Sequence, residues 1–221
     1  LGWDVPATIT IEGAVEGSNA EGNVEQGDIL RAITTPDGVR HEITSAATPF
    51  AIMRSVPAGS TMTLTVERLG TTQDVSFDSV ATSATETGSK LGVYLSADPV
   101  LPIDITVNID GVGGPSAGMM FSLSIIDRLT PGDMTGGNVI AGTGTMSYDG
   151  QVGAIGGIQQ KLWGAHRDGA QWFLAPSNNC DEVVGHVPDG LRVVSVSTLD
   201  EAVSAVRSIA DGTGDALPTC Q

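Results

Sequence analysis

Apolar and polar residues alternate from Ile103 to Ile109, which is the period of a strand with one buried face. The segment 117–129 is apolar on nearly all sides, which predicts a helix buried in a core. Between them lies a glycine-rich bend, GGPSAG at 113–118. Ser116 is therefore predicted to lie where a strand turns into a helix, among backbone N–H groups without intrahelical acceptors.

Strand and helix patterns continue to alternate from Leu91 onward, which predicts a mixed domain over 91–221. Further strands are predicted at 139–147, 171–175 and 191–196, and helices at 158–167 and 181–184. Ser197 or Thr198 is predicted to cap a last helix that ends near Ala210. For the whole chain we predict the α+β class.

Residues 1–78 are predicted to form a separate domain of short strands, with one short helix from Thr48 to Met53. Two alternating runs on either side of Leu69-Gly70 predict a closing hairpin. The segment 79–90 is small and polar without periodicity, which predicts a linker.

The first domain resembles a PDZ domain. The resemblance rests on a small-residue turn, GSNAEG at 17–22, and on Gly27-Asp28-Ile29-Leu30 after it. It implies that Leu1, Gly2 and Trp3 are the remnant of a carboxylate-binding loop, so that a peptide would bind as an extra strand. The alternative is a PDZ-like module that only positions or covers the second domain.

The position of Ser116 is compatible with two roles. A serine at a helix N-terminus is often only an N-cap. The same backbone N–H groups also stabilise negative charge on an attacked carbonyl oxygen, which favours a nucleophile. Pro115 has no N–H, so the oxyanion donors would be Ser116 and either Gly113 or Gly114.

A nucleophilic serine needs a base, and Lys161 is the candidate that the pattern favours. His41, His166 and His186 lie in no recognisable motif. Lys161 follows Ile158 by three residues, so it lies at the edge of the apolar stripe of its helix. A lysine that points into a core has a lowered pKa and can accept a proton. The alternative is a lysine whose amine extends to solvent along its aliphatic stem.

Three blocks in residues 91–210 resemble the proteolytic domain of Lon-type proteases: GGPSAG, the Thr143-Gly144 pair, and IGGIQQKL at 155–162. The resemblance implies a Ser–Lys dyad of Ser116 and Lys161, with Thr143 orienting the amine. Together with the first domain, it resembles bacterial membrane-anchored, extracytoplasmic PDZ-plus-Lon proteases. Two features depart from the family: Gly113 replaces a common acid, and the sequence contains no phosphate-binding loop, so no ATPase is encoded here.

The net charge of −16 argues against nucleic acid and anionic membrane surfaces as partners. No apolar run approaches the ~20 residues of a membrane span. The resemblance to membrane-anchored proteases implies an anchoring segment that precedes Leu1. No motif indicates a metal or another cofactor. Cys180 and Cys220 are predicted to form a disulfide, which favours an oxidising, extracytoplasmic compartment.

The sequence therefore predicts an ATP-independent serine endopeptidase acting on unfolded or exposed polypeptide segments. The resemblance adds a homo-oligomer, a six-membered ring by analogy. One alternative is an inactive PDZ-containing adaptor that binds peptides. The other alternative is a nucleotide-binding protein, but the glycine-rich bend lacks the lysine and the spacing of a phosphate loop.

Overall fold

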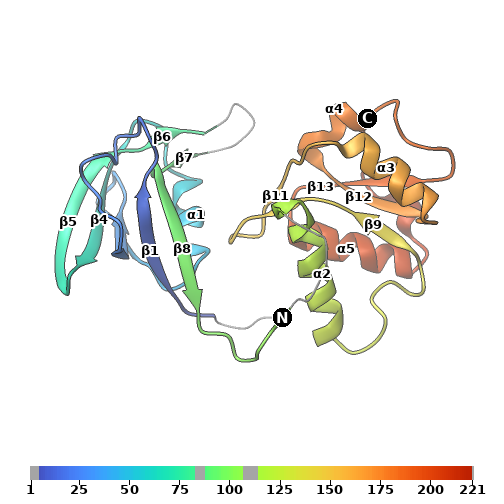
Figure 1. Ribbon diagram of the computed structural model, residues 1–221, viewed down its shortest axis with the longest axis horizontal. Coiled ribbons are helices and arrows are strands. Elements are labelled where there is room, and N and C mark those ends of the chain that lie inside the picture. The colour runs from blue at the N-terminus through green and yellow to red at the C-terminus, as the bar shows by residue number, and fades with distance from the viewer. Residues whose placement is uncertain (1–4, 83–87, 107–113, 221) are drawn as a thin grey trace. The chain divides into compact units, whose positions relative to one another are not determined.

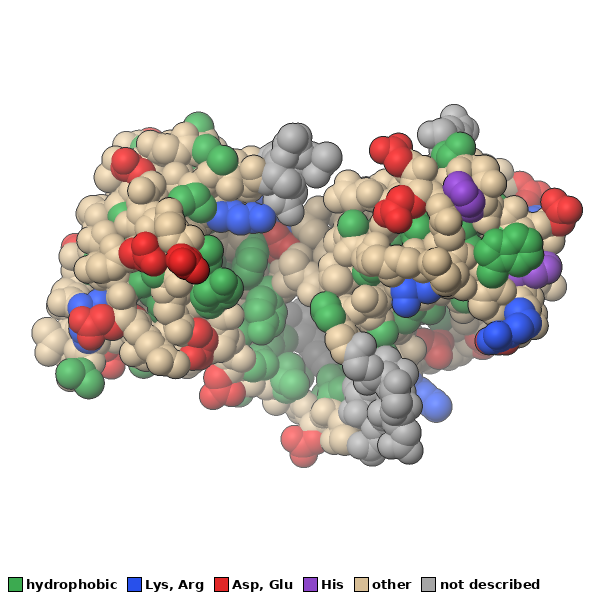
Figure 2. All heavy atoms as spheres, turned by 45° about the horizontal axis from the view of Figure 1, so that its top comes forward, with side chains coloured by type: hydrophobic (Ala, Val, Ile, Leu, Met, Phe, Trp, Pro, Cys, Tyr) green, Lys and Arg blue, Asp and Glu red, His purple; other side chains and the backbone are tan. Residues whose placement is uncertain are grey.

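A computed structural model describes residues 5–82, 88–106 and 114–220 (Figure 1). The chain divides into two compact units, a first unit of residues Gly2–Val107 and a second unit of residues Asn108–Gln221. Helices and strands occur in both units, so the α+β class is confirmed. Asp and Glu side chains are scattered over the visible surface of each unit, as the net charge requires (Figure 2).

The first unit is built on an antiparallel sheet with the strand order β5-β4-β2-β1-β8, in which β3 also pairs with β2. Alternation positions its core, because Ile9 and Ile11 are buried while Thr8 and Glu12 of the same strand are exposed. The elements are β1 (Ala7–Ala14), β2 (Asp28–Thr34), β3 (Arg40–Glu42), α1 (Thr48–Met53), β4 (Thr61–Arg68), β5 (Thr71–Asp78), β6 (Val80–Ala81), β7 (Ser89–Lys90) and β8 (Val93–Pro99).

The position of β8 corrects the predicted domain boundary. Strand β8 pairs antiparallel with β1, from Ala7 opposite Pro99 to Ala14 opposite Val93, so it belongs to the sheet of the first unit. The side chains of Val93, Leu95 and Ala97 pack on the core of that unit. Without β8, strand β1 would have an unpaired edge beside this core. The first unit therefore extends to Val107 instead of ending at 78.

The predicted linker 79–90 contains paired structure as well. Strands β6 and β7 pair through Val80 with Lys90 and Ala81 with Ser89. Residues 83–87 lie outside the described part of the chain.

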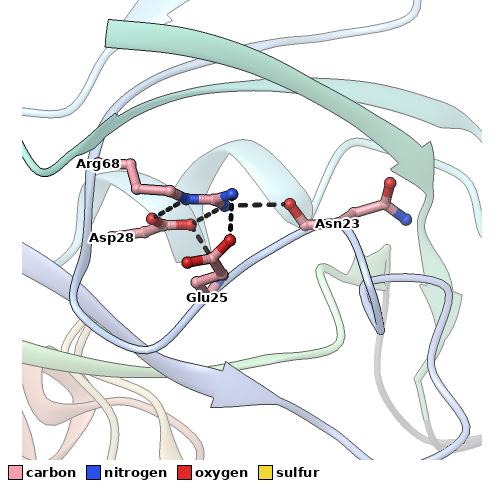
Figure 3. Close-up of polar contacts among 4 residues, drawn as sticks. All are labelled: Asn23, Glu25, Asp28 and Arg68. Atoms are coloured by element: carbon pink, nitrogen blue, oxygen red, sulfur yellow. Dashed lines mark hydrogen bonds and ion pairs between the residues drawn. The ribbon is translucent and has the colours of Figure 1, made fainter. Parts of the chain in front are cut away.

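One ion-pair cluster joins the start of β2 to the end of β4 (Figure 3). The Arg68 guanidinium donates to both carboxylate oxygens of Asp28, at 2.7 Å each, and to Glu25 Oε1 at 2.7 Å. It also donates to the Asn23 carbonyl, at 3.3 Å. Asp28 is only 1% exposed, and the hydrogen bonds from Arg68 hold the pKa of its carboxyl below the ordinary value.

The second unit is built on a parallel sheet with the strand order β13-β12-β9. Trp172 and Leu174 of β12 face one core cluster, which includes residues of α2 and α5, while Phe173 and Ala175 face another, which includes residues of α3 and α4. The sheet therefore has helices on both faces (Figure 1). The elements are α2 (Gly118–Leu129), β9 (Ile140–Gly142), β10 (Thr145–Met146), β11 (Val152–Gly153), α3 (Ile158–Arg167), β12 (Trp172–Pro176), α4 (Cys180–Val183), β13 (Arg192–Val196) and α5 (Leu199–Ala210), with 3-10 turns at Pro115–Ala117, Ser177–Asn179 and Gly214–Ala216.

Two sequence predictions near Ser116 need correction. Residues 103–106 are not in a strand, and 107–109 lie outside the described residues. Helix α2 is not buried all round, because only Met119 and Leu123 are buried and its other apolar side chains are half-buried. An apolar residue thus marks a face of α2 that is only partly covered within the second unit.

The C-terminal tail is tied to the second unit. Cys180, at the start of α4, forms a disulfide with Cys220. The carbonyl of Pro218 also accepts a hydrogen bond from Ser195 N, at 2.9 Å. Thr198 caps α5 by accepting from Glu201 N, at 3.1 Å. Across the described residues, no helix has the length and apolarity that crossing a membrane requires.

Candidate active site

Ser116 lies in the 3-10 turn Pro115–Ala117, directly before α2, and is half-buried. The turn begins after Gly114, whose backbone has φ 83° and ψ 170°, a conformation that favours glycine. The N–H groups of such a turn have no intrahelical acceptor. The structure therefore places Ser116 directly before α2, at the helix start that the sequence predicts.

Two hydrogen bonds fix the backbone of Ser116. Its carbonyl accepts from Gly144 N, at 2.8 Å, and from the Thr143 hydroxyl, at 2.9 Å. The carbonyl of Gly144 in turn accepts from Met119 N of α2, at 3.1 Å. The turn and the first residues of α2 are thereby joined to the segment that follows β9.

Glycine is required where these two segments approach each other. A Cβ at Gly118 would lie 3.0 Å from Met146 N, and one at Gly144 would lie 2.7 Å from a methyl group of Val152. Either side chain would force Met146 or Val152 to shift in this closely packed region.

Thr143 contacts the backbone of Ser116 in this structure. It is 3% exposed, its N–H donates to the Leu174 carbonyl at 3.1 Å, and its hydroxyl donates to the Ser116 carbonyl. The resemblance implied that this hydroxyl orients the Lys161 amine. A hydroxyl has one donor and two lone pairs, so Thr143 can still accept from an amine while it donates to Ser116.

Lys161 is exposed, which contradicts its predicted burial. Ile158 and Leu162 of α3 are fully buried, and Lys161 lies a step of about 100° around the helix from Leu162, at the edge of the stripe. Its flexible aliphatic stem reaches water from that edge. Within the described ranges its ammonium group has no hydrogen bond or ion pair.

Ser116 and the start of α3 lie at the same edge of the sheet. The carbonyl of Ser116 binds to Thr143 and Gly144, which follow the carboxyl end of β9. The loop before α3 binds through Ile155 to Asn179, which follows the carboxyl end of β12. Because β9 and β12 are parallel, these two ends share one edge. Lys161, the fourth residue of α3, therefore lies in the first turn of a helix that begins at the same edge as Ser116.

This arrangement can be compared with known proteins. The family description "Lon protease (S16) C-terminal proteolytic domain" matches residues 53–208. The chain belongs to the Lon proteolytic-domain family. The match begins inside the first unit, in α1, so the family's region is not confined to the second unit.

Whole Lon proteases align with parts of the chain. "Lon protease 2" of Herpetosiphon aurantiacus is 30% identical over 158 residues, which cover 69% of this chain and 19% of that protein. "Lon protease" of Clostridioides difficile is 37% identical over 93 residues, which cover 41% of this chain and 12% of that protein. The chain thus corresponds to less than a fifth of either relative.

Solved PDZ domains are similar to part of the chain. The PDZ domain of the SdrC-like protein from Listeria innocua covers 40% of this chain and 92% of its own, with 17% identity and a TM-score of 0.35. The corresponding domain from Listeria monocytogenes has 14% identity and the same TM-score.

Several predicted site residues lie outside the described residues. These are Gly113, one of the oxyanion donors, and the peptide-binding residues Leu1, Gly2 and Trp3. Gly114 and Ser116, the other proposed donors of the Lon-type site, are described above. No group of His, Cys, Asp and Glu within the described ranges has the arrangement of a metal site.

Asn179 contacts the loop that leads into α3, and the sequence patterns assigned it no role. It is 2% exposed, and its amide pairs with both the N–H and the carbonyl of Ile155, at 2.9 Å each. The available signal was an asparagine three residues after a strand of buried residues, which pattern analysis alone assigns to a turn.

Proposed function

We propose that the chain is the proteolytic part of a serine endopeptidase that acts without ATP, with Ser116 as nucleophile and Lys161 as general base. The observation that carries this proposal is the double hydrogen bond from Thr143 and Gly144 to the carbonyl of Ser116. It holds the serine at the sheet edge where α3 begins. Membership of the Lon family supports the same chemistry.

The proposed reaction proceeds through an acyl-enzyme. Neutral Lys161 removes the proton from the Ser116 hydroxyl, whose oxygen attacks the peptide carbonyl carbon. The N–H groups of Gly114 or Gly113 and of Ser116 stabilise the oxyanion. Lys161 then protonates the leaving amine as the peptide C–N bond breaks. In the second step Lys161 removes a proton from a water that attacks the acyl carbon, and returns it to the Ser116 oxygen as the ester bond breaks. Lys161 must act as the free amine, because an ammonium group has no lone pair with which to accept a proton.

The test is digestion of a disordered protein with product analysis by mass spectrometry. The wild-type protein is expected to cleave without ATP, and the Ser116→Ala protein is expected to be inactive. Ser124→Ala, which alters an exposed serine of α2, is the matched control and should cleave like the wild type. Equal cleavage by the Ser116→Ala protein would exclude Ser116 as nucleophile.

The second candidate function is peptide binding by the first unit. The bound peptide would be either a substrate delivered to the protease or the ligand of a catalytically inactive adaptor. Strand β8 supports peptide binding, because it lies at one end of the sheet order and pairs only with β1 among the described strands. Such an edge can accept a peptide as an additional strand. Labelling of Ser116 by a fluorophosphonate would exclude the inactive adaptor, whereas peptide binding without labelling would favour it.

We also propose an extracytoplasmic location, with an anchor preceding the sequence, and a six-membered ring. The Cys180–Cys220 disulfide supports the compartment, since such bonds persist under oxidising conditions. Alkylation of intact cells before lysis should leave both cysteines unmodified, and sedimentation of the purified protein should show six copies. Alkylation of both cysteines would contradict the extracytoplasmic location. Sedimentation as a single copy at high protein concentration would contradict the ring.

A further inference from the structure

The loop that leads into α3 has little support of its own. Residues 154–157 connect β11 to α3, and two of the four are glycines. Gly157, the N-cap residue, has φ 71° and provides no side chain to cap the helix. The position of the first turn of α3 therefore depends on contacts from elsewhere in the fold.

Asn179 supplies those contacts. Its Oδ1 accepts from Ile155 N and its Nδ2 donates to the Ile155 carbonyl, both at 2.9 Å. The second Nδ2 hydrogen is directed to Glu182 Oε1, at 2.8 Å. Both donors of the amide and its oxygen are thus used. Only an amide offers a donor and an acceptor that match the backbone of one residue in this way.

The segment that carries Asn179 is itself fixed. Cys180, the next residue, is bonded to Cys220. Cys220 packs against the core cluster that contains Ile155, Ile158 and Leu162. The amide therefore projects from a covalently tied segment onto the loop before α3.

We propose that Asn179 is a positioning residue for the hydrolysis proposed above, acting through Ile155 to align Lys161 with Ser116. Lys161 is exposed, so burial of its own side chain does not fix its amine. Its place is set by the position of α3, whose residues Ile158 and Leu162 are buried in the same cluster as Ile155. The inference rests on the proposed function, because it assigns Lys161 a role in the reaction.

The test compares Asn179→Asp with Asn138→Asp. The first variant keeps the shape of the side chain but removes both donors and places a second carboxylate beside Glu182. In the control, Asn138 donates to the Thr135 carbonyl within a loop of the same unit. Asn179→Ala is the additional variant if the aspartate prevents folding. Each protein is treated with a fluorophosphonate at several concentrations, and labelling of Ser116 is followed by mass spectrometry.

We expect the maximal labelling rate to fall by about tenfold to a hundredfold in Asn179→Asp, since small misalignments have effects of that size. The probe concentration at half-maximal rate should stay unchanged, because Asn179 does not contact the probe. Hydrogen exchange should increase in peptides covering 154–162, and Asn138→Asp should behave like the wild type. A purely structural role would lower the thermal midpoint without changing the labelling rate of the folded protein, and that result would overturn the inference.

Failure of the proposed function is distinguishable from failure of this inference. If the wild-type protein neither labels nor cleaves, the proposed function fails and the positioning role fails with it, whatever the exchange experiment shows. If the wild-type protein labels and Asn179→Asp labels at the same rate, only the positioning role is contradicted.

Discussion

At the scale of single residues, the hydroxyl of Thr143 has a role that can be separated from its size. Thr143→Val keeps the shape but removes the donor to the Ser116 carbonyl, which retains only Gly144 N. Loss of one buried hydrogen bond should lower the free energy of unfolding by about 1 kcal/mol. The labelling rate of Ser116 should fall as well, because the turn gains freedom.

The control for this prediction is Thr143→Ser, which retains the hydroxyl. It should keep most of the labelling rate despite the missing methyl group. Equal labelling rates for the valine variant and the wild type would show that Gly144 alone is sufficient to hold the turn.

The Arg68–Asp28 ion pair predicts a pH dependence of stability. Asp28 has a lowered pKa in the folded protein, chiefly because of its hydrogen bonds from Arg68 and against the opposing effect of burial. Its stabilising contribution is therefore complete above the unfolded pKa of about 3.9 and is lost as the pH falls through the folded pKa.

Arg68→Ala should destabilise the first unit by about 3 kcal/mol at neutral pH, since it leaves Asp28 buried without its cation. The difference in the free energy of unfolding between Arg68→Ala and the wild type should shrink below about pH 4, as Asp28 becomes protonated in the unfolded and then the folded protein. Urea unfolding at several pH values measures this difference. A difference that stays constant down to pH 2 would indicate that Arg68 acts through packing.

At the scale of elements, β8 provides a test of where the first unit ends. Leu95 packs on the core of this unit, while Tyr94 is 59% exposed on the opposite face of the strand. Leu95→Asp should lower the free energy of unfolding of the first unit by about 2 kcal/mol or more, since it places a charge among apolar side chains. Tyr94→Asp, the matched control, should have an effect of about 0.5 kcal/mol or less.

Hydrogen exchange of peptides from β1 and β2 would follow this effect directly. If Leu95→Asp left their exchange unchanged, β8 would contribute nothing to the first unit and a boundary near 78 would be restored.

Local signals in the sequence were sufficient for elements whose pattern is set by their own residues. The strand Trp172–Pro176, the helix Ile158–Arg167 and the capped helix Leu199–Ala210 lie close to their predicted ranges. The pairing of β8 was not predictable in this way, because its partner β1 lies about 80 residues earlier and no local pattern specifies a partner.

The candidate site shows the same division. The glycine-rich bend predicted that Ser116 lies at a helix start, and Ser116 lies in the turn directly before α2. The exposure of Lys161 did not follow, because its place at the edge of a stripe allows burial or extension into water equally. Asn179 acts on the backbone of Ile155, 24 residues earlier in the chain, so its role depends on tertiary structure that the sequence pattern does not encode.

At the scale of the whole molecule, the two units predict independent responses to loss of the disulfide. Cys180 and Cys220 are 40 residues apart and both lie in the second unit. In the chain-entropy account, closing a loop of that length stabilises the folded state by about 4 kcal/mol. The Cys180→Ala/Cys220→Ala protein should therefore lose up to that amount in the second unit and none in the first.

Hydrogen exchange under increasing urea can follow both units in one experiment, because peptides report on each separately. Peptides from β12 and β13 should exchange at lower urea in the double variant, while those from β2 and β4 should keep their wild-type midpoint. A reducing agent added to the wild-type protein should reproduce the shift, which excludes an effect of the alanines themselves. A parallel shift in the strands of the first unit would show that the two units unfold together, and the division of the chain at Val107 would then describe its contacts but not its cooperativity.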